Sequence, residues 1–237
     1  MSDNGMTGGG SGTQGQDLAP GYPFYNANMK GLKGSTDEGG VRVPFFVSWK
    51  GKITPGRDID RVAAHIDILP TLAALTGAPL PRGDQVEGRS LLPLIENPAA
   101  PWEDRPIFAH VCRWPPGADP DNFRDSNFSV RTQNFRLVAG GAGGGARKKG
   151  KKETAEVKPA APALYDMQAD PSQTKNVIDE HPDVARQMLE SYHRYWKEAR
   201  PLMVNESAPM SPTRPYHEWF NQQKAATGIP EWQAPEL

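Results

Sequence analysis

Two glycine-rich segments divide this 237-residue chain and decide where regular structure can form. Eleven of the 24 glycines lie in residues 1–40 and six lie in residues 140–150, which leaves seven for the rest of the chain. Glycine loses more backbone entropy on folding than any other residue, so both segments are predicted to be loops. Helices and strands are therefore expected mainly in residues 41–139 and 163–199.

Charge and composition exclude several classes of protein. The net charge of −1 argues against a nucleic-acid-binding domain. No run of 18 apolar residues exists, so no membrane span is expected, and the first five residues lack the basic and apolar regions of a signal peptide. The single cysteine, Cys112, excludes an internal disulfide framework and a multi-cysteine zinc site.

The first half of the chain predicts one strand and one helix. Residues 41–49 are apolar and β-branched, which is typical of a strand, with Pro44 at its start, at an edge or at a bulge. A helix is expected to begin after Asp67 as N-cap, with Pro70 in its first turn, and to end at Gly77. Residues 78–105 are predicted to be a proline-rich surface connection with an apolar patch at 91–95.

The second half predicts short strands followed by a helix. Strands are expected at 107–111, 128–131, 135–138 and 164–165, and residues 182–199 have the apolar spacing of an amphipathic helix. Residues 140–162 are glycine-rich and then lysine-rich, as expected for a flexible insertion or long surface loop. The tail from residue 200 holds six prolines and several aromatic residues, and is predicted to wrap over the surface.

These patterns predict an α/β protein with three parts. Residues 1–105 form the end of an α/β domain, residues 106–199 form a small antiparallel sheet with a packed helix, and residues 200–237 form the tail. A lone strand and one helix cannot cover each other's two faces, so residues 41–77 are expected to pack against further strands. On this reading the chain is an incomplete domain.

Two weak local motifs suggest anion and cation chemistry. Asp3 and Asn4 offer a carboxylate and an amide oxygen to a hard cation, although Asn-Gly is also a common turn and a Ca²⁺ site needs roughly six to eight oxygens. Lys33 lies in a glycine-rich turn, from which an ammonium group can reach an anion or remain solvated. His65 beside Asp67 could act as a general base, but a helix N-cap explains Asp67 better.

Four blocks in a fixed order make the sequence specific. They are Ser-Asp-Asn-Gly at residues 2–5, Lys-Gly-Ser-x-x-Glu-Gly-Gly-x-Arg-Val-Pro at 33–44, His-Ile-Asp-Ile-Leu-Pro-Thr-Leu-Ala-Ala-Leu-Thr-Gly at 65–77, and Glu-Gly-Arg-Ser-Leu-Leu-Pro-Leu at 87–94. Together with Leu-Tyr-Asp-Met at 164–167, they resemble the C-terminal half of the sulfatase family. The resemblance covers roughly residues 1–199, with 140–162 as an insertion.

The resemblance implies an alkaline-phosphatase-like α/β fold and a sulfuric ester hydrolase of the arylsulfatase kind. Asp3 and Asn4 match the family's pair of ligands for a divalent cation, usually Ca²⁺, and Lys33 matches the lysine that contacts the sulfate group. The implied partner is a sulfate ester, either an aryl or a carbohydrate sulfate. Glu38, Gly39, Gly40 and Arg42 also match, and are interpreted as shaping the turn and the strand that follows it.

The chain departs from the family at the nucleophile. Family members use a formylglycine made from the Cys or Ser of a Cys/Ser-x-Pro-x-Arg motif in their N-terminal half. Neither Cys112, followed by Arg-Trp-Pro-Pro, nor Ser207 fits that motif. The cation site is also incomplete, because the family's early Asp pair is absent. No catalytic residue is therefore expected in this chain, and alone it is expected to be inactive.

Two alternatives remain open at this point. One is a phosphodiesterase or phosphonate hydrolase of the same superfamily, which the missing nucleophile motif would distinguish. The other is a non-catalytic remnant or anion-binding module using Lys33 and the basic residues of 147–152. Localisation is hidden too, although export is expected if the full-length protein carries a signal peptide.

Overall fold

A computed structural model describes residues 1–6, 26–80, 86–111, 114, 117–140, 161–203 and 213–228. The chain divides into a unit of residues 1–199 and a second unit of residues 200–237. The insertion predicted at 140–162 lies almost wholly outside the described residues, as does Cys112.

An antiparallel sheet of four strands forms the centre of the first unit. The strands are β1 (Ile107–His110), β2 (Phe128–Arg131), β3 (Phe135–Ala139) and β4 (Ala163–Asp166), in the order β1-β2-β3-β4. The register pairs Phe128 with Ala139 and Arg131 with Arg136 across β2 and β3. The predicted strands and their antiparallel arrangement are confirmed, within one or two residues at each end.

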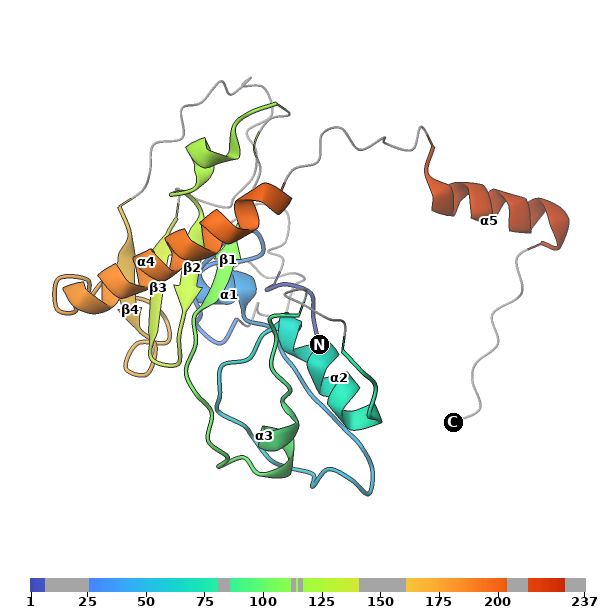
Figure 1. The fold of residues 1–237 in the computed structure, drawn as a ribbon, viewed down its shortest axis with the longest axis horizontal. Helices are drawn as coiled ribbons and strands as arrows, with labels where there is room; N and C mark the ends of the chain where they lie inside the picture. The colour runs from blue at the N-terminus through green and yellow to red at the C-terminus, as the bar shows by residue number, and fades with distance from the viewer. Residues whose placement is uncertain are drawn as a thin grey trace, which may run out of the picture. The chain divides into compact units, whose positions relative to one another are not determined.

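One face of the sheet is covered by α4 (Pro182–Ala199), with the bounds predicted for the amphipathic helix (Figure 1). Tyr192 of α4 is fully buried and stacks on Phe128, with ring centroids 3.8 Å apart and planes within 4° of parallel. Beside this pair, Tyr195 stacks on Phe108 at 4.5 Å. Alternation along each strand directs Phe128, Val130 and Leu137 to this face.

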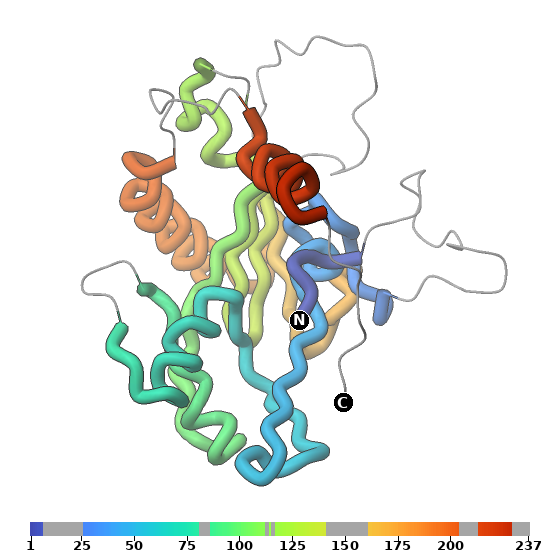
Figure 2. Tube along the Cα trace, turned by 90° about the vertical axis from the view of Figure 1, so that its right-hand side faces the viewer, coloured from blue at the N-terminus to red at the C-terminus, as the bar shows by residue number. Residues whose placement is uncertain are grey.

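The opposite face carries polar side chains and is covered by the loop that contains α1 (Glu38–Val41). Figure 2 shows α4 and this loop on opposite sides of the strands. Ser129 and Arg136 of the sheet are almost fully buried under the loop. The sheet is thus the middle layer of three, which gives each of its faces a cover.

The predicted helix after Asp67 is confirmed as α2 (Ile68–Thr76), preceded by the short 3₁₀ helix η1 (His65–Asp67). Pro70 lies in the first turn, where its missing N–H costs no helical hydrogen bond. Gly77 ends the helix in the left-handed conformation, with φ 70°.

The apolar patch at 91–95 was wrongly predicted to lie on a surface connection. Residues Leu92–Glu96 form the short helix α3, and Leu91, Leu94 and Ile95 are buried in a small core of their own. The partly buried side chains of Ile53, Ala100 and Trp102 pack against it. Local proline content misled the prediction because the patch is buried by residues distant in sequence.

The strand predicted at 41–49 is wrong for this chain. Val41 ends α1, and residues 42–49 form no strand and are mostly exposed. Phe46 is 86% exposed. A strand exists only when a neighbouring strand takes up its backbone hydrogen bonds, and the described residues supply none here.

The second unit contains the 3₁₀ helix η3 (Arg200–Leu202) and α5 (Pro215–Ala226), which the sequence interpretation did not foresee. No residue of α5 is buried. Within the part of the chain that the structure describes, no helix has the length and apolar character needed to cross a membrane.

Candidate functional site

The N-terminal residues lie directly against the glycine-rich turn of residues 31–40. The Gly5 N–H donates to the Gly40 carbonyl at 3.0 Å, and the Lys33 N–H donates to the Met6 carbonyl at 2.9 Å. These two bonds place the backbone of Asp3 and Asn4 beside the turn that carries Lys33. The structure therefore brings together the two segments that the sequence singled out separately.

Glycine is required for this close approach. A Cβ built on Gly5 would lie 1.9 Å from the Gly39 carbonyl oxygen, and one on Gly40 would lie 2.2 Å from the Ser35 carbonyl oxygen. Both distances are far inside van der Waals contact, so neither position can hold a side chain without moving backbone. The expectation that Gly39 and Gly40 shape the turn is confirmed, and the glycine of Ser-Asp-Asn-Gly has the same role.

The three predicted site residues differ in how they are held. Asp3 and Lys33 are exposed, and Asn4 is half-buried with its carbonyl accepting a hydrogen bond from Ser2 Oγ at 2.9 Å. Asp3 and Asn4 supply oxygen donors of the kind Ca²⁺ prefers, but only two residues of the set it needs. Among the described residues, no group of three or more His, Cys, Asp or Glu side chains is placed to hold a metal ion. Asp3 and Asn4 alone therefore offer fewer ligands than a Ca²⁺ site needs.

A buried ion pair fixes the turn to the sheet. Glu38, 4% exposed, accepts a hydrogen bond from Arg136 Nη1 at 2.7 Å, and Arg131 Nε lies 3.5 Å from the same carboxylate oxygen. Arg136 Nη2 also donates to the Thr36 carbonyl at 2.5 Å and to Ser129 Oγ at 3.1 Å. Gln173 completes the network, because its Oε1 accepts from the Glu38 N–H at 2.7 Å.

Burial changes the acidity of both arginines. It lowers the pKa of Arg136 to about 10, with Glu38 opposing the shift, and it also lowers the pKa of Arg131. Arg136 therefore stays charged at neutral pH, paired with Glu38. A structural role for Glu38 is predicted by the sequence, whereas Arg136 and Gln173 are not predicted by it. Alternation along β3 places Arg136 on the face opposite to Phe135 and Leu137, and no pattern in the sequence shows that this face is covered.

Lys30 makes a second link between the turn and the sheet. Its Nζ donates to the Tyr165 hydroxyl at 2.9 Å and lies 3.9 Å from Asp37. Burial opposes the charged form, yet the hydrogen bond from Lys30 to Tyr165 and the charge of Asp37 raise the pKa of this lysine. The Lys30 ammonium is thus engaged by Tyr165 and Asp37, whereas Lys33, three residues further along the chain, is exposed.

Asp67 is structural, as the sequence favoured. It is fully buried, and its carboxylate accepts hydrogen bonds from the backbone N–H groups of Ala64 and Arg89, both at 2.8 Å. Arg105 Nη2 also donates to this carboxylate. Asp67 precedes α2 as predicted, but its side chain makes no N-cap bond to that helix. The Asp67 carboxylate instead links the start of α2 to the backbone of Arg89 and to the side chain of Arg105.

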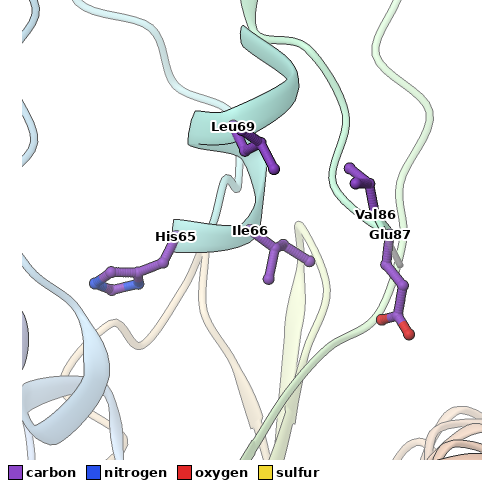
Figure 3. A pocket seen from close by; sticks show the side chains of 5 residues that line it. All are labelled: His65, Ile66, Leu69, Val86 and Glu87. Carbon is purple, nitrogen blue, oxygen red and sulfur yellow. The ribbon is translucent and has the colours of Figure 1, made fainter. Parts of the chain in front are cut away.

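His65 has no part in a catalytic pair with Asp67. His65 is exposed and Asp67 is engaged elsewhere. An open hollow of about 250 Å³ is lined by His65, Ile66, Leu69, Val86 and Glu87. Figure 3 shows the ring of His65 directed away from Val86 and Glu87. The hollow is mainly apolar and brings no nucleophile together with a base.

Several other candidates fall outside the described residues. Cys112, Ser207 and the lysine-rich residues 147–152 are among them. What the sequence predicts for these residues remains a prediction.

Comparison with known proteins identifies the family. The model of the C-terminal region of N-sulphoglucosamine sulphohydrolase matches residues 33–141. Human steryl-sulfatase is 39% identical over 98 residues, which are 38% of this chain and 17% of that protein. Bovine arylsulfatase A is 31% identical over 164 residues, which are 67% of this chain and 30% of that protein. Each match thus spans less than a third of the length of the relative.

Solved structures share the fold. Ps i-CgsB in complex with k-i-k-neocarrahexaose superposes with a TM-score of 0.57 at 20% identity, covering 90% of this chain and 40% of that one. A protein from a glycosaminoglycan-metabolism locus of Bacteroides thetaiotaomicron has a TM-score of 0.51 at 26% identity, covering 71% and 32%. The family match, the relatives and the shared fold agree with the order of the four sequence blocks. The chain belongs to the sulfatase family and corresponds to its C-terminal portion.

Proposed function

We propose that this chain supplies part of the active site of a sulfuric ester hydrolase. The observation that supports it is the pair of backbone hydrogen bonds from Gly5 to Gly40 and from Lys33 to Met6. They hold the Asp3–Asn4 segment and the Lys33 turn as one unit. Two segments that match separate functional motifs of the family are thus organised together without any other part of the protein.

In this proposal Asp3 and Asn4 hold a divalent cation, Ca²⁺ by the family resemblance, and Lys33 contacts the sulfate group. The cation would draw charge from the sulfuryl oxygens as the S–O bond breaks. The Lys33 ammonium would do the same from the protein side and orient the ester. Glu38 and Arg136 keep the turn rigid, so that Lys33 is presented from a fixed backbone.

The nucleophile is assigned to a part of the enzyme that this chain does not contain, because no Cys/Ser-x-Pro-x-Arg sequence occurs in it. The purified chain is therefore expected not to hydrolyse a chromogenic aryl sulfate in the presence of Ca²⁺. Turnover by the isolated chain that disappears in Lys33→Ala would contradict this assignment.

A chimera tests the roles of the three residues directly. The part of bovine arylsulfatase A outside its match would be joined upstream of Met1, and sulfate and phosphate esters would be compared as substrates. We expect sulfate ester hydrolysis, lowered about 100-fold or more in kcat/KM by Lys33→Ala. Lys50→Ala, an exposed lysine distant from the turn in sequence, is the control. Equal activity in both variants would mean that Lys33 is not part of the active site.

A further inference from the structure

The glycine-rich turn carries two carboxylates close to Lys33 in sequence, Asp37 and Glu38. The Glu38 carboxylate is buried and paired with Arg136 at 2.7 Å, so its charge is compensated inside the protein. The Asp37 side chain is 20% exposed, and Lys30 Nζ lies 3.9 Å from its Oδ1. A sulfate ester is an anion, and a carboxylate turned toward its site would repel it. The direction of the Asp37 carboxylate therefore matters for any anion that Lys33 binds.

Neighbours on several sides fix the Asp37 carboxylate. Ser35 Oγ donates to its Oδ2 at 2.8 Å, and Gln173 Nε2 donates to its Oδ1 at 3.3 Å. Gly31 leaves the space for this arrangement, because a Cβ built on it would lie 2.8 Å from the Asp37 Cβ. The φ of Gly31 is 84°, a conformation that favours glycine. The carboxylate is thus directed toward Lys30, Ser35 and Gln173.

Gln173 is held so that its carboxamide has one orientation. The side chain is 3% exposed, and its Oε1 accepts the Glu38 N–H at 2.7 Å. Because the oxygen is engaged there, the NH₂ group faces Asp37 as a donor. The backbone of Gln173 is left-handed, with φ 55°, which is uncommon outside glycine and concentrated at functional sites. A carboxylate at this position would accept the Glu38 N–H but would have no proton to donate to Asp37.

We propose that Gln173 is a positioning residue of the anion site. Its carboxamide holds the Asp37 carboxylate beside Lys30, whose ammonium is bonded to Tyr165 of β4. The negative charge of Asp37 is thereby compensated on the sheet side of the turn, and Lys33 presents a positive charge to a sulfate ester. This role of Gln173 rests on the proposed contact between Lys33 and the sulfate group.

Substitutions that change the charge and the donors at residue 173 test this role. Gln173→Glu keeps an acceptor for the Glu38 N–H and places a carboxylate against Asp37. Adding Asp37→Asn removes the repulsion and reverses the hydrogen bond, because the asparagine amide donates to the glutamate. Gln168→Glu is the matched control, since Gln168 is exposed and its Nε2 donates to the Gln133 carbonyl, outside the turn.

The first measurement is hydrolysis of a chromogenic aryl sulfate by the chimera with the upstream part of bovine arylsulfatase A. Gln173→Glu is expected to raise KM about 10-fold and to change kcat less than about 2-fold, because the released charge weakens binding of the ester and of its transition state alike. The double variant with Asp37→Asn should return KM to within about 2-fold of the parent value. A general loss of structure would lower kcat as well and would not be restored by a second substitution.

The second measurement uses this chain alone and needs no activity. Hydrogen exchange of the Gly39 amide, which donates to the Lys30 carbonyl at 2.7 Å, reports whether the turn keeps its shape. Gln173→Glu should speed this exchange about 10-fold, the double variant should restore it, and Gln168→Glu should leave it unchanged. If Gln173→Glu fails to fold, Gln173→Met removes the donor and the acceptor without adding a charge, and KM and exchange should change in the same direction.

Two results would overturn the role of Gln173. One is the same KM and the same Gly39 exchange in Gln173→Glu as in Gln168→Glu. The other is a KM that stays raised after Asp37→Asn is added, which would mean that Gln173 does not act through Asp37. A parent chimera that hydrolyses no sulfate ester would instead contradict the proposed function, and exchange in the chain alone would then decide whether Gln173 positions the turn.

Discussion

The two halves of the first unit differ in how far their apolar side chains are buried. In residues 107–199, the aromatic side chains of the sheet and of α4 are buried against one another, and Tyr192 is fully enclosed. In residues 43–80, Phe46 and Leu72 face outward. Both regions are rich in apolar residues, so composition does not explain the difference.

The difference lies in whether a region contains its own partner. The sheet has α4 on one face and the α1 loop on the other, and each cover lies in the same chain. Residues 43–49 have neither a neighbouring strand nor a covering layer among the described residues. An apolar segment can thus be encoded in the sequence and still be exposed where the described residues supply nothing to cover it.

We call residues 107–199 the closed region and residues 43–80 the open region. The largest predicted effect tests the packing of the closed region. Tyr192→Ala removes a fully buried ring stacked on Phe128, together with a hydroxyl that donates to the Arg124 carbonyl at 2.6 Å. We expect the free energy of unfolding to fall by about 3–5 kcal/mol, measured by urea titration. Leu72→Ala in the open region should change it by no more than about 0.5 kcal/mol. Equal losses would mean that the two regions do not differ in packing.

The next effect tests the link between the closed region and the turn. Arg136→Ala leaves Glu38 buried without its closest cation. We expect a loss of about 3 kcal/mol, at the lower end of the cost of breaking a buried ion pair, because Arg131 and Gln173 still hold Glu38. The exposed Arg194 on α4 provides a matched control, and Arg194→Ala should leave the urea midpoint unchanged. A midpoint unchanged in Arg136→Ala would show that the pair does not hold the turn.

A smaller effect is expected where the N-terminal segment meets the turn. Gly5→Ala places a methyl group 1.9 Å from the Gly39 carbonyl oxygen, so the segment must move away. We expect a loss of about 1–3 kcal/mol and faster hydrogen exchange at the Lys33 amide, which donates to Met6. In Gly140→Ala the nearest atom would be 3.8 Å away, so the amide should be unaffected. The same exchange rate in both variants would show that the segment of Asp3 and Asn4 is not held against the turn.

The smallest effect is a pH dependence of the closed region. Burial lowers the pKa of His110 below its ordinary value of 6.5, against hydrogen bonds to backbone groups such as the Phe123 carbonyl. The folded state therefore favours the neutral ring, and its contribution to stability is complete above pH 6.5 and decreases as the pH falls through the lowered pKa. Urea midpoints compared at pH 7 and pH 5 should show this loss, and His110→Phe should reduce it. An identical loss in the variant would assign the pH dependence to other groups.

Elements that depend on nearby residues were predictable from the sequence. The bounds of α4 followed from its apolar spacing and from Pro182 and Pro201 beside its ends, and Gly77 as the end of α2 followed from its left-handed preference. The strands at 128–131 and 135–139 are joined by a short turn, so their pairing needs no distant segment. The turn around Gly39 and Gly40 was likewise predictable, because close backbone approach admits no side chain.

Features that depend on distant residues were not predictable. Arg136 on β3 meets Glu38 across about a hundred positions, and no local pattern shows which acidic residue a buried arginine will find. The strand expected at 41–49 is wrong for the same reason, since an apolar run does not show whether another strand pairs with it, and none among the described residues does. The 91–95 patch was buried by residues the sequence interpretation did not connect with it.

The amino-acid sequence alone indicates the family, through the order of four short blocks, and marks Asp3, Asn4 and Lys33 as candidate site residues. It also determined most local elements, because caps, turns and apolar periods act over a few residues. The three-dimensional structure is needed to see that the N-terminal segment lies against the Lys33 turn and that Glu38 and Arg136 fasten this turn to the sheet. It is also needed to see that residues 43–49 have no strand partner among the described residues. Those relations depend on contacts between residues far apart in the chain, and only folding brings such residues together.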